Sequence, residues 1–580
     1  MSAQPVTENL PAPSSTGPGA RLRSIAPLVA IVLIGAGLRL WRLDAVPPGI
    51  NQDEAVHAYD AWCLLKTGRD HDGASWPIFF RAFGDYHPGT YVYTIIPFEA
   101  VLGLRVLAAR LPAALIGAAA VPLAFLLVRK RYGDIAGLLA AALLAISPWH
   151  VHLSRLAFEA GTCPTLLLLG YVLLQSAHLS RPAASLRGSS RARQLLMLVS
   201  AGLVFGLTTW TYHAMRLVVP ALLIVTLWLY RRQARQLLQT PSARVSVFAV
   251  SGGLLIGLTP FLAATIHAPE QVWARAAAVV SGSGDQSIGA AGLSLLKNYA
   301  SHFSPTFLFI QGDQSEIQSM PNYGQAHFLA MALLPLGIIH ILRNWHGDRF
   351  GRLLLAWLLI GPVPAAFTNW HGGHALRGVG MLPALELISA LGALQLIDFA
   401  RKHSQSSMRI STAALIGLML VSAGLFCRRF FVEYPIRSAP AFQSEWADAF
   451  AEVKEKQDDY DLVLLSPDRS NQLGMLYLFW TQMDPAAYQK GDKDIEQLIG
   501  IERITRIGKV VFRPSTYLPI LGPQLPPCAR VLVVERPDVP VAGVKLKSFH
   551  LPDGREALVM YDLTSKDIPS ASPCPQGAAK

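Results

Sequence analysis

Long apolar segments recur through most of the sequence, and they constrain the fold more than any other feature. Each runs for about 15 to 23 residues, at or slightly below the length that an α-helix needs to cross a bilayer. The recurrence continues to about Cys427, and only 15% of the 580 residues are charged. Because a single soluble core cannot bury so much apolar surface, the sequence predicts an α-helical polytopic membrane protein.

The length rule predicts about eleven membrane-spanning helices. They lie at about 25–41, 106–128, 135–151, 162–179, 195–213, 217–230, 245–266, 326–342, 353–368, 379–397 and 412–427. We take residues 88–104 as an interfacial or re-entrant helix, because they contain Pro88, Pro97 and Glu99. Counted as a full crossing, they would place the basic residues 129–131 outside. With that choice the basic links fall inside, as the positive-inside rule expects, and the C-terminal end falls outside.

The composition divides the chain into three parts. Residues 1–23 are rich in Pro, Ser and Gly, which predicts a disordered cytoplasmic leader. Residues 24–430 are predicted to form the membrane domain, with a first outer loop at 44–105. In residues 431–580, β-rich runs alternate with helix-like stretches, which predicts a small soluble α/β domain on the outer side. Of the five cysteines only Cys528 and Cys574, both in that domain, are candidates to pair.

The formal net charge of +12 does not indicate a nucleic-acid partner. No run of Lys and Arg is interleaved with aromatic residues, and the basic residues gather in the short links between apolar segments. The excess of basic residues is therefore explained by their position in the predicted cytoplasmic links.

Most of the unusual polar side chains fall in links that this topology places outside. Two adjacent carboxylates, Asp53 and Glu54, follow the first apolar segment, where they stay ionised and still face a lipid-borne substrate. The other candidates in these links are Lys66, Arg69, His87, Arg155, Glu159, Tyr212, His213, Arg216, His374 and Arg377. Carboxylates can activate a hydroxyl acceptor, while imidazoles and basic groups can stabilise an anionic lipid headgroup.

Each of these clusters also has a purely structural explanation. An Asp-Glu pair after an apolar helix is most often a solvated helix end, and Tyr212 with His213 fits an aromatic belt. Arg377 fits a side chain that extends from its helix toward the interface. The pair at 150 and 152, His-x-His, has no third ligand nearby in the sequence, which weighs against a metal site. The catalytic interpretation is favoured because all of these polar clusters are predicted to lie on one face of the membrane.

Two other classes of function remain open at this point. A transporter or flippase of lipid-linked or anionic substrates predicts ionisable residues and broken helices near the middle of the membrane, often in related halves. In this sequence the charges gather at one surface and no halves match. A sensor or assembly factor, with the membrane part as a scaffold, is the third interpretation.

Several motifs together resemble one known family. They are Asp-Glu-Ala-x-x-x-Tyr-Asp-Ala from residue 53, Leu-Leu-Lys-Thr-Gly-Arg-Asp-x-x-Gly from residue 64, Arg-Leu-Pro-Ala-Ala-Leu-x-Gly from residue 110, and the segments 147–159, 211–217, 307–313 and 374–377. Between about residues 25 and 400 the chain resembles the bacterial branch of the protein O-mannosyltransferase and aminoarabinose transferase superfamily. The members of that superfamily are integral-membrane GT-C glycosyltransferases that use polyprenyl-phosphate sugars.

The resemblance implies a reaction and a location. We expect an inverting transfer of a hexose or pentose from a polyprenyl-phosphate donor to a hydroxyl of a protein, lipid or glycan. The enzyme would be a multi-pass protein of the inner membrane, with a cytoplasmic N-terminus and an extracytoplasmic C-terminal domain. The tail after about residue 430 is not similar to the sugar-binding repeats of the eukaryotic mannosyltransferases. The resemblance therefore does not imply which acceptor this chain uses.

The resemblance also assigns roles to residues. The general base maps onto Asp53, with Glu54 as its neighbour, and a second acidic residue maps onto Glu159. We expect basic groups to stabilise the departing phosphate, namely Lys66, Arg69, Arg155, Arg216 and Arg377, together with His374. No cofactor is needed on this account. The three carboxylates could hold a divalent metal, but we do not favour that option.

Overall fold

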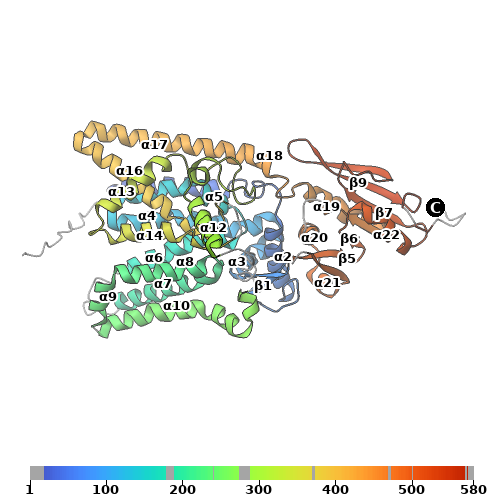
Figure 1. The fold of residues 1–580 in the computed structure, drawn as a ribbon, viewed down its shortest axis with the longest axis horizontal. Helices are drawn as coiled ribbons and strands as arrows, with labels where there is room; N and C mark the ends of the chain where they lie inside the picture. The colour runs from blue at the N-terminus through green and yellow to red at the C-terminus, as the bar shows by residue number, and fades with distance from the viewer. Residues whose placement is uncertain are drawn as a thin grey trace, which may run out of the picture.

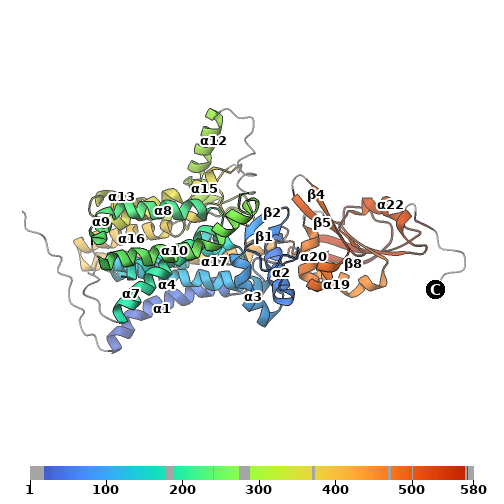
Figure 2. The same cartoon turned by 90° about the horizontal axis from the view of Figure 1, so that it is seen from below.

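The computed structural model describes residues 18–177, 189–239, 241–273, 288–368, 372–467, 472–498, 501–568 and 571–572. They form a helical part, from α1 to α18, and a C-terminal part with a β-sheet (Figure 1). In Figures 1 and 2 the C-terminal part lies at one end of the molecule, beyond helix α2 (Gln52–Thr67). The opposite end, formed by α9, the start of α14 and the turn between α16 and α17, is called the distal end below.

The helical part is long, apolar and membrane-like. Its main helices are α1 (Pro18–Leu40), α4 (Val106–Ala145), α5 (Pro148–Leu153), α6 (Cys163–Ser176), α7 (Ser189–Thr211), α8 (Met215–Leu229), α9 (Arg231–Leu238), α10 (Pro241–His267), α12 (Ile288–Ser301), α13 (Ala330–Arg343), α14 (Arg349–Ile360), α15 (Val363–Ala366), α16 (Ala384–His403), α17 (Gln405–Arg428) and α18 (Tyr434–Ser438). Among the described residues, six helical stretches are long and apolar enough to cross a membrane, and four shorter apolar helices accompany them. The membrane class is therefore confirmed, whereas the predicted number of eleven crossings stays a prediction.

Two predicted boundaries look different in the structure. The crossings expected at 106–128 and 135–151 begin within one 40-residue helix, α4, which is interrupted by Gly133 at φ 86°. Of the predicted leader, residues 1–17 lie outside the described residues, and α1 already begins at Pro18.

Residues 44–105, which the sequence predicts to form the first outer loop, contain more regular structure than the sequence indicates. Helix α2 is followed by the antiparallel pair β1 (Phe79–Ala82) and β2 (Asp85–Pro88), and then by the apolar helix α3 (Thr90–Leu102). The turn that joins the two strands uses Phe83 and Gly84 at positive φ, and the register places Phe80 opposite His87.

The C-terminal part contains the α/β structure that the sequence predicts. Its strands are β3 (Leu462–Leu465), β4 (Lys493–Leu498), β5 (Ile501–Ile507), β6 (Val510–Val511), β7 (Arg530–Glu535), β8 (Val544–His550) and β9 (Glu556–Thr564), and its helices are α19 (Glu445–Lys456), α20 (Leu473–Thr481), α21 (Pro485–Lys490) and α22 (Leu518–Leu521). The seven strands form one sheet in the order β4-β5-β6-β3-β7-β9-β8, in which β3 is parallel to both of its neighbours. Cys528 is disulfide-bonded, but Cys574 lies outside the described residues, so their pairing stays a prediction.

The two parts share a hydrophobic core. Buried residues of α2, α3 and the start of α4 pack in one cluster with residues of α19, α20 and the sheet. Polar contacts cross the same boundary, since the Tyr59 hydroxyl donates to the Met483 carbonyl at 3.1 Å and the Gln489 amide donates to the Asp70 carbonyl at 2.8 Å. Helix α2 therefore lies between the helical part and the C-terminal part.

Candidate active site

The N-terminus of α2 presents Asp53 to solvent from a fixed backbone. The Asn51 side chain accepts hydrogen bonds from the amides of Asp53 at 2.7 Å and Glu54 at 3.1 Å, and the Glu54 carboxylate accepts one from the Asn51 amide, which completes a capping box. Asp53 is exposed, and the N-terminus of a helix favours a nearby negative charge. The structure thus places one of the two predicted carboxylates where a substrate can reach it.

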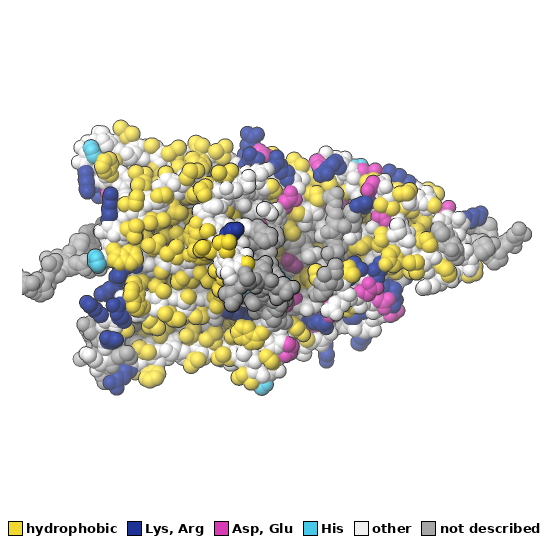
Figure 3. Space-filling view, in the orientation of Figure 1, with side chains coloured by type: hydrophobic (Ala, Val, Ile, Leu, Met, Phe, Trp, Pro, Cys, Tyr) yellow, Lys and Arg dark blue, Asp and Glu magenta, His cyan; other side chains and the backbone are white. Residues whose placement is uncertain are grey.

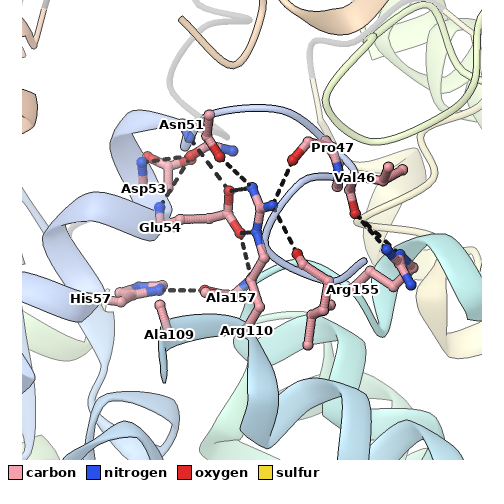
Figure 4. A network of polar contacts seen from close by, with 12 residues as sticks. Val46, Pro47, Asn51, Asp53, Glu54, His57, Ala109, Arg110, Arg155 and Ala157 are labelled. Carbon is pink, nitrogen blue, oxygen red and sulfur yellow. Dashed lines mark hydrogen bonds and ion pairs between the residues drawn. The ribbon is translucent and has the colours of Figure 1, made fainter. Parts of the chain in front are cut away.

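Glu54, in contrast, is buried and fully engaged (Figure 4). Arg110 donates from Nε to Oε1 and from Nη2 to Oε2, both at 2.8 Å, and the Ala157 amide donates to Oε1 at 2.8 Å. Arg110 also donates to the carbonyls of Pro47 and Gly49. The prediction that Glu54 binds substrate is wrong, because both of its oxygens hold α2 against α4 and the preceding loop.

Arg155 is also a structural residue. Its side chain is buried and donates to backbone carbonyls of the segment that leads from α1 to α2, namely those of Leu38, Arg39, Trp41, Arg42 and Val46. The guanidinium lies over the Phe431 ring, 5.1 Å from its centroid. The prediction that it stabilises a phosphate is wrong, because carbonyl oxygens already occupy its donors.

Lys66 and Arg69 lie at the other end of α2 from Asp53. Lys66 is in the last turn with its ammonium over the Trp62 ring, and Arg69 follows the C-cap and donates to the Gly73 carbonyl. At about 1.5 Å per residue, Lys66 is about 20 Å along the helix axis from Asp53. The role of Lys66 and Arg69 at the leaving phosphate therefore stays a prediction, and neither side chain lies beside Asp53.

One helical turn after Asp53, His57 belongs to a cluster of polar rings. Its Nδ1 is 2.8 Å from the Ala157 carbonyl, and its Nε2 is 3.9 Å from a carboxylate oxygen of Glu159. The His87 ring is 4.5 Å from that of His57, and the Tyr91 ring is 6.0 Å away. The structure therefore brings the predicted residues Glu159 and His87 together at His57. Sequence reasoning did not select His57, although its spacing of four residues from Asp53 places both on one face of the helix.

His87 lies on β2 between this cluster and the turn after α7. Both ring nitrogens are buried with no hydrogen-bond partner among the described residues. Burial, together with the neighbouring imidazoles of His57, His71 and His213, holds the pKa of His87 well below its usual range. His87 is therefore neutral at pH 7, with a single N–H to donate.

Arg216 in the first turn of α8 faces the same hairpin. Its guanidinium lies 5.7 Å from the ring centroid of Phe79 on β1 and 5.2 Å from that of Phe261. Nη1 donates to the Val272 carbonyl at 2.6 Å, whereas Nε and Nη2 are buried with no hydrogen-bond partner among the described residues. The predicted residues Tyr212 and His213 form the turn that precedes α8, with ring centroids 6.4 Å apart.

His374 and Arg377 belong to a second group around Asp313. The Asp313 carboxylate accepts a hydrogen bond from the Ala375 amide at 2.6 Å and lies 3.6 Å from Nδ1 of His374. Burial raises the pKa of Asp313, while backbone hydrogen bonds and the charge of Arg377 oppose that shift. Nε2 of His302 accepts from the His374 amide, so the side chains of Asp313 and His302 both hold this loop.

The described residues contain no group of three or more His, Cys, Asp or Glu side chains arranged to hold a metal ion. Whether the chain needs a metal stays a prediction.

Comparisons with known proteins agree with the motifs. The sequence model of the dolichyl-phosphate-mannose-protein mannosyltransferase family matches residues 86–263. A search of curated protein sequences finds no match. Among solved structures, the chain is similar to apo ArnT from Cupriavidus metallidurans, at 12% identity and a TM-score of 0.52, over 93% of this chain and 98% of that one. ArnT from the same organism bound to undecaprenyl phosphate matches at 13% identity and a TM-score of 0.50, over 94% and 98% of the two chains.

The resemblance that the motifs predict is therefore confirmed, and so is the GT-C fold. The match extends over both the helical part and the C-terminal part.

Proposed function

We propose that this membrane protein is an inverting glycosyltransferase that moves a sugar from a polyprenyl-phosphate donor to a hydroxyl acceptor. The observation that carries the proposal is the exposed Asp53, fixed by the capping box and placed one turn from the cluster of His57, His87 and Glu159. The mannosyltransferase family match and the structural similarity to an ArnT that binds undecaprenyl phosphate support a lipid phosphate sugar as the donor.

In this mechanism Asp53 acts as the general base. It takes the proton of the acceptor hydroxyl while that oxygen attacks the anomeric carbon, and the bond from this carbon to the lipid phosphate breaks. The electron pair leaves with the phosphate, so that the products are the glycoside and polyprenyl phosphate. Positioned proton transfer contributes about a hundredfold to ten-thousandfold in rate, and stabilisation of the leaving phosphate must supply much of the rest.

Arg216 and His87 are the groups that we assign to the phosphate. Two guanidinium nitrogens of Arg216 have no hydrogen-bond partner among the described residues, and the neutral His87 has one N–H to donate. Buried donors of this kind stabilise an anion strongly because little water competes with them. We assign Glu159 to positioning, because its carboxylate faces His57 rather than solvent.

The location and the substrate classes are part of the same proposal. The donor enters from the outer leaflet of an inner membrane, with the C-terminal part on the outer side, and the sugar is a hexose or a pentose. The acceptor hydroxyl belongs to a protein, a lipid or a glycan.

The alternative of a transporter finds less support in the placement of buried charges. Arg39 donates to His150 at 2.8 Å, and Glu386 accepts from Ser147 at 2.6 Å, so both ionisable groups are buried among the helices. However, Arg39 is in the last turn of α1 and Glu386 is in the first turn of α16. A transport site near the middle of the membrane would instead place such groups near the middle of the helices.

An assay of the purified protein tests the proposal, with a polyprenyl-phosphate sugar as donor and a crude envelope fraction as acceptor. Asp53→Asn should lower turnover at least about a hundredfold without changing the thermal unfolding temperature, because the side chain is exposed and the cap is retained. The matched control is Asp44→Asn, which neutralises another exposed carboxylate in the same loop and should retain turnover. Near-normal turnover of Asp53→Asn would exclude Asp53 as the base.

A further inference from the structure

Basic side chains gather at the distal end of the helical part. In Figure 3 dark blue side chains lie beyond the wide hydrophobic band, at the end away from the C-terminal part. Three arginines there come from two different helices and approach one residue. Arg349 of α14 lies over the ring of Tyr230, the C-cap of α8, and Arg352 of α14 and Arg131 of α4 lie near the same tyrosine.

Arg131, Arg349 and Arg352 are called the distal arginine cluster, and the contacts of each are defined. The Arg349 guanidinium lies 5.8 Å from the Tyr230 ring centroid, and the Arg352 guanidinium lies 5.6 Å from that of Trp345. Arg349 and Arg352 are three residues apart on α14, so they share one face of the helix. Arg131 reaches the same place, because its Nη2 donates to the Gly347 carbonyl at 3.3 Å.

Among the described residues, the carboxylate that contacts this cluster is Asp348, and its single negative charge does not balance three arginines. Asp348 caps α14 by accepting from the Gly351 amide at 3.0 Å, accepts the Tyr132 hydroxyl at 2.5 Å and lies 3.6 Å from Nε of Arg131. Among the residues that the structure describes, neither Arg349 nor Arg352 forms an ion pair, and Nε of Arg352 is buried with no hydrogen-bond partner. Two guanidiniums are thus available to an anion from outside the chain.

The surroundings indicate what kind of anion would reach them. Tryptophans with exposed rings, Trp228 at 56% and Trp345 at 39%, flank the cluster where the apolar helices end. Amphipathic aromatic rings next to basic side chains are typical of the headgroup level of a membrane. Phospholipid phosphates lie at that depth, and basic pockets between membrane helices bind acidic headgroups.

We propose that Arg349 and Arg352, together with Arg131 and Tyr230, form a binding site for the phosphate headgroup of an anionic phospholipid. The site is at the end of the helical part opposite to Asp53 and its function is independent of sugar transfer. The bound lipid would hold α4, α8 and α14 together at the distal end, because the cluster draws on all three.

Lipid binding by the full-length protein tests this proposal. The protein is released from detergent micelles with added phosphatidylglycerol, and bound lipids are counted by native mass spectrometry across a concentration series. In the double variant Arg349→Gln/Arg352→Gln, the Kd of the most tightly bound phosphatidylglycerol should rise about 30-fold. The reason is that each basic residue near a membrane surface contributes about 1 kcal/mol to lipid binding. The matched control is Arg401→Gln/Lys402→Gln, which removes the same charge from exposed positions at the same end and should bind within about twofold of the unaltered protein.

Each outcome decides the question. Equal weakening in the two double variants would show a general charge effect and overturn the site, as would unchanged binding in Arg349→Gln/Arg352→Gln. Phosphatidylcholine should not distinguish the variants. Competition by millimolar inorganic phosphate alone would assign the cluster to a soluble phosphate and overturn the lipid assignment. If the double variant fails to fold, Arg352→Lys keeps the charge and should bind nearly normally, whereas the single variant Arg352→Gln should not.

Discussion

Glu54 and Arg110 are both fully buried, so each depends on the other for its charge balance. Removing one partner of such a pair leaves an uncompensated charge inside the protein, which costs about 3–5 kcal/mol. We therefore expect Glu54→Gln to lower the thermal unfolding temperature in detergent far more than Asp53→Asn does. Equal unfolding temperatures for the two variants would contradict the assignment of Glu54 to structure and Asp53 to solvent.

Arg155 offers a second test at a single residue. It spreads its guanidinium over several carbonyls, a geometry that the single ammonium of lysine cannot reproduce. Arg155→Lys should lose about 2–3 kcal/mol of stability, because charged hydrogen bonds inside a protein are lost. The KM for the lipid donor should stay within about twofold, since carbonyl oxygens already occupy the donors of Arg155. A large increase in that KM at unchanged stability would restore the role that the sequence predicted.

The sequence identified most of the residues in the candidate site, but it did not separate catalytic from structural ones. Asp53 and Glu54 are adjacent, and consecutive residues of a helix point in directions about 100° apart, so one faces solvent and the other faces Arg110. Which of the two is buried depends on α4, which lies far away in the sequence. The structural role of Arg155 was not predictable for the same reason. Its partners are backbone carbonyls, which any residue type supplies, so the sequence does not indicate them.

At the scale of elements, α2 is tied to the loop that follows it by a buried ion pair. Nδ1 of His71 is 2.6 Å from the Asp60 carboxylate, which also accepts the His71 amide. Burial alone would lower the pKa of His71, but the charge and the hydrogen bond of Asp60 outweigh it and raise that pKa to about 9. The protonated imidazole is therefore part of the folded state.

This ion pair predicts how stability changes with pH. Because the folded pKa lies above the unfolded value of about 6.5, the stabilisation is fully present below about pH 6.5 and is lost as the pH rises through about 9. Thermal unfolding measured from pH 6 to pH 10 should show a decline over that window. His71→Gln should be less stable at pH 6 and should show a smaller decline. An unaltered decline in the variant would assign the pH dependence to another group.

Elements with a long apolar or alternating pattern were predictable, whereas those held by tertiary contacts were not. The membrane helices and the strands at 462–465 and 530–535 follow directly from such patterns. The hairpin of β1 and β2 has only four residues in each strand and ends in Pro88, so its sequence carries little signal. It is stabilised by packing of Phe79 with Trp210, which depends on the helical fold being present.

At the scale of the whole molecule, the C-terminal part supports the helix that carries Asp53. The sequence predicted an α/β domain without a role, because the contacts that define the role join residues about 400 positions apart. Gln489 donates to the Asp70 carbonyl and to the Thr67 hydroxyl at 3.1 Å, and Gln482 donates to the Leu104 carbonyl at 3.0 Å. These bonds fix the two ends of the segment that leads from the C-terminal end of α2 to the start of α4.

Loss of these bonds should loosen α2 without unfolding the protein. Each of the three bonds contributes about 1 kcal/mol, so Gln482→Ala/Gln489→Ala should weaken the docking by about 3 kcal/mol and speed amide exchange in the second half of α2 by up to about 150-fold. Hydrogen–deuterium exchange read by mass spectrometry measures this directly, and Gln497→Ala on the exposed strand β4 is the matched control. Because the capping box and the Glu54–Arg110 pair hold the other end of α2, exchange around Asp53 should change much less. Uniform acceleration over the whole helix would show instead that α2 opens as one unit, and that the C-terminal part controls the position of Asp53 itself.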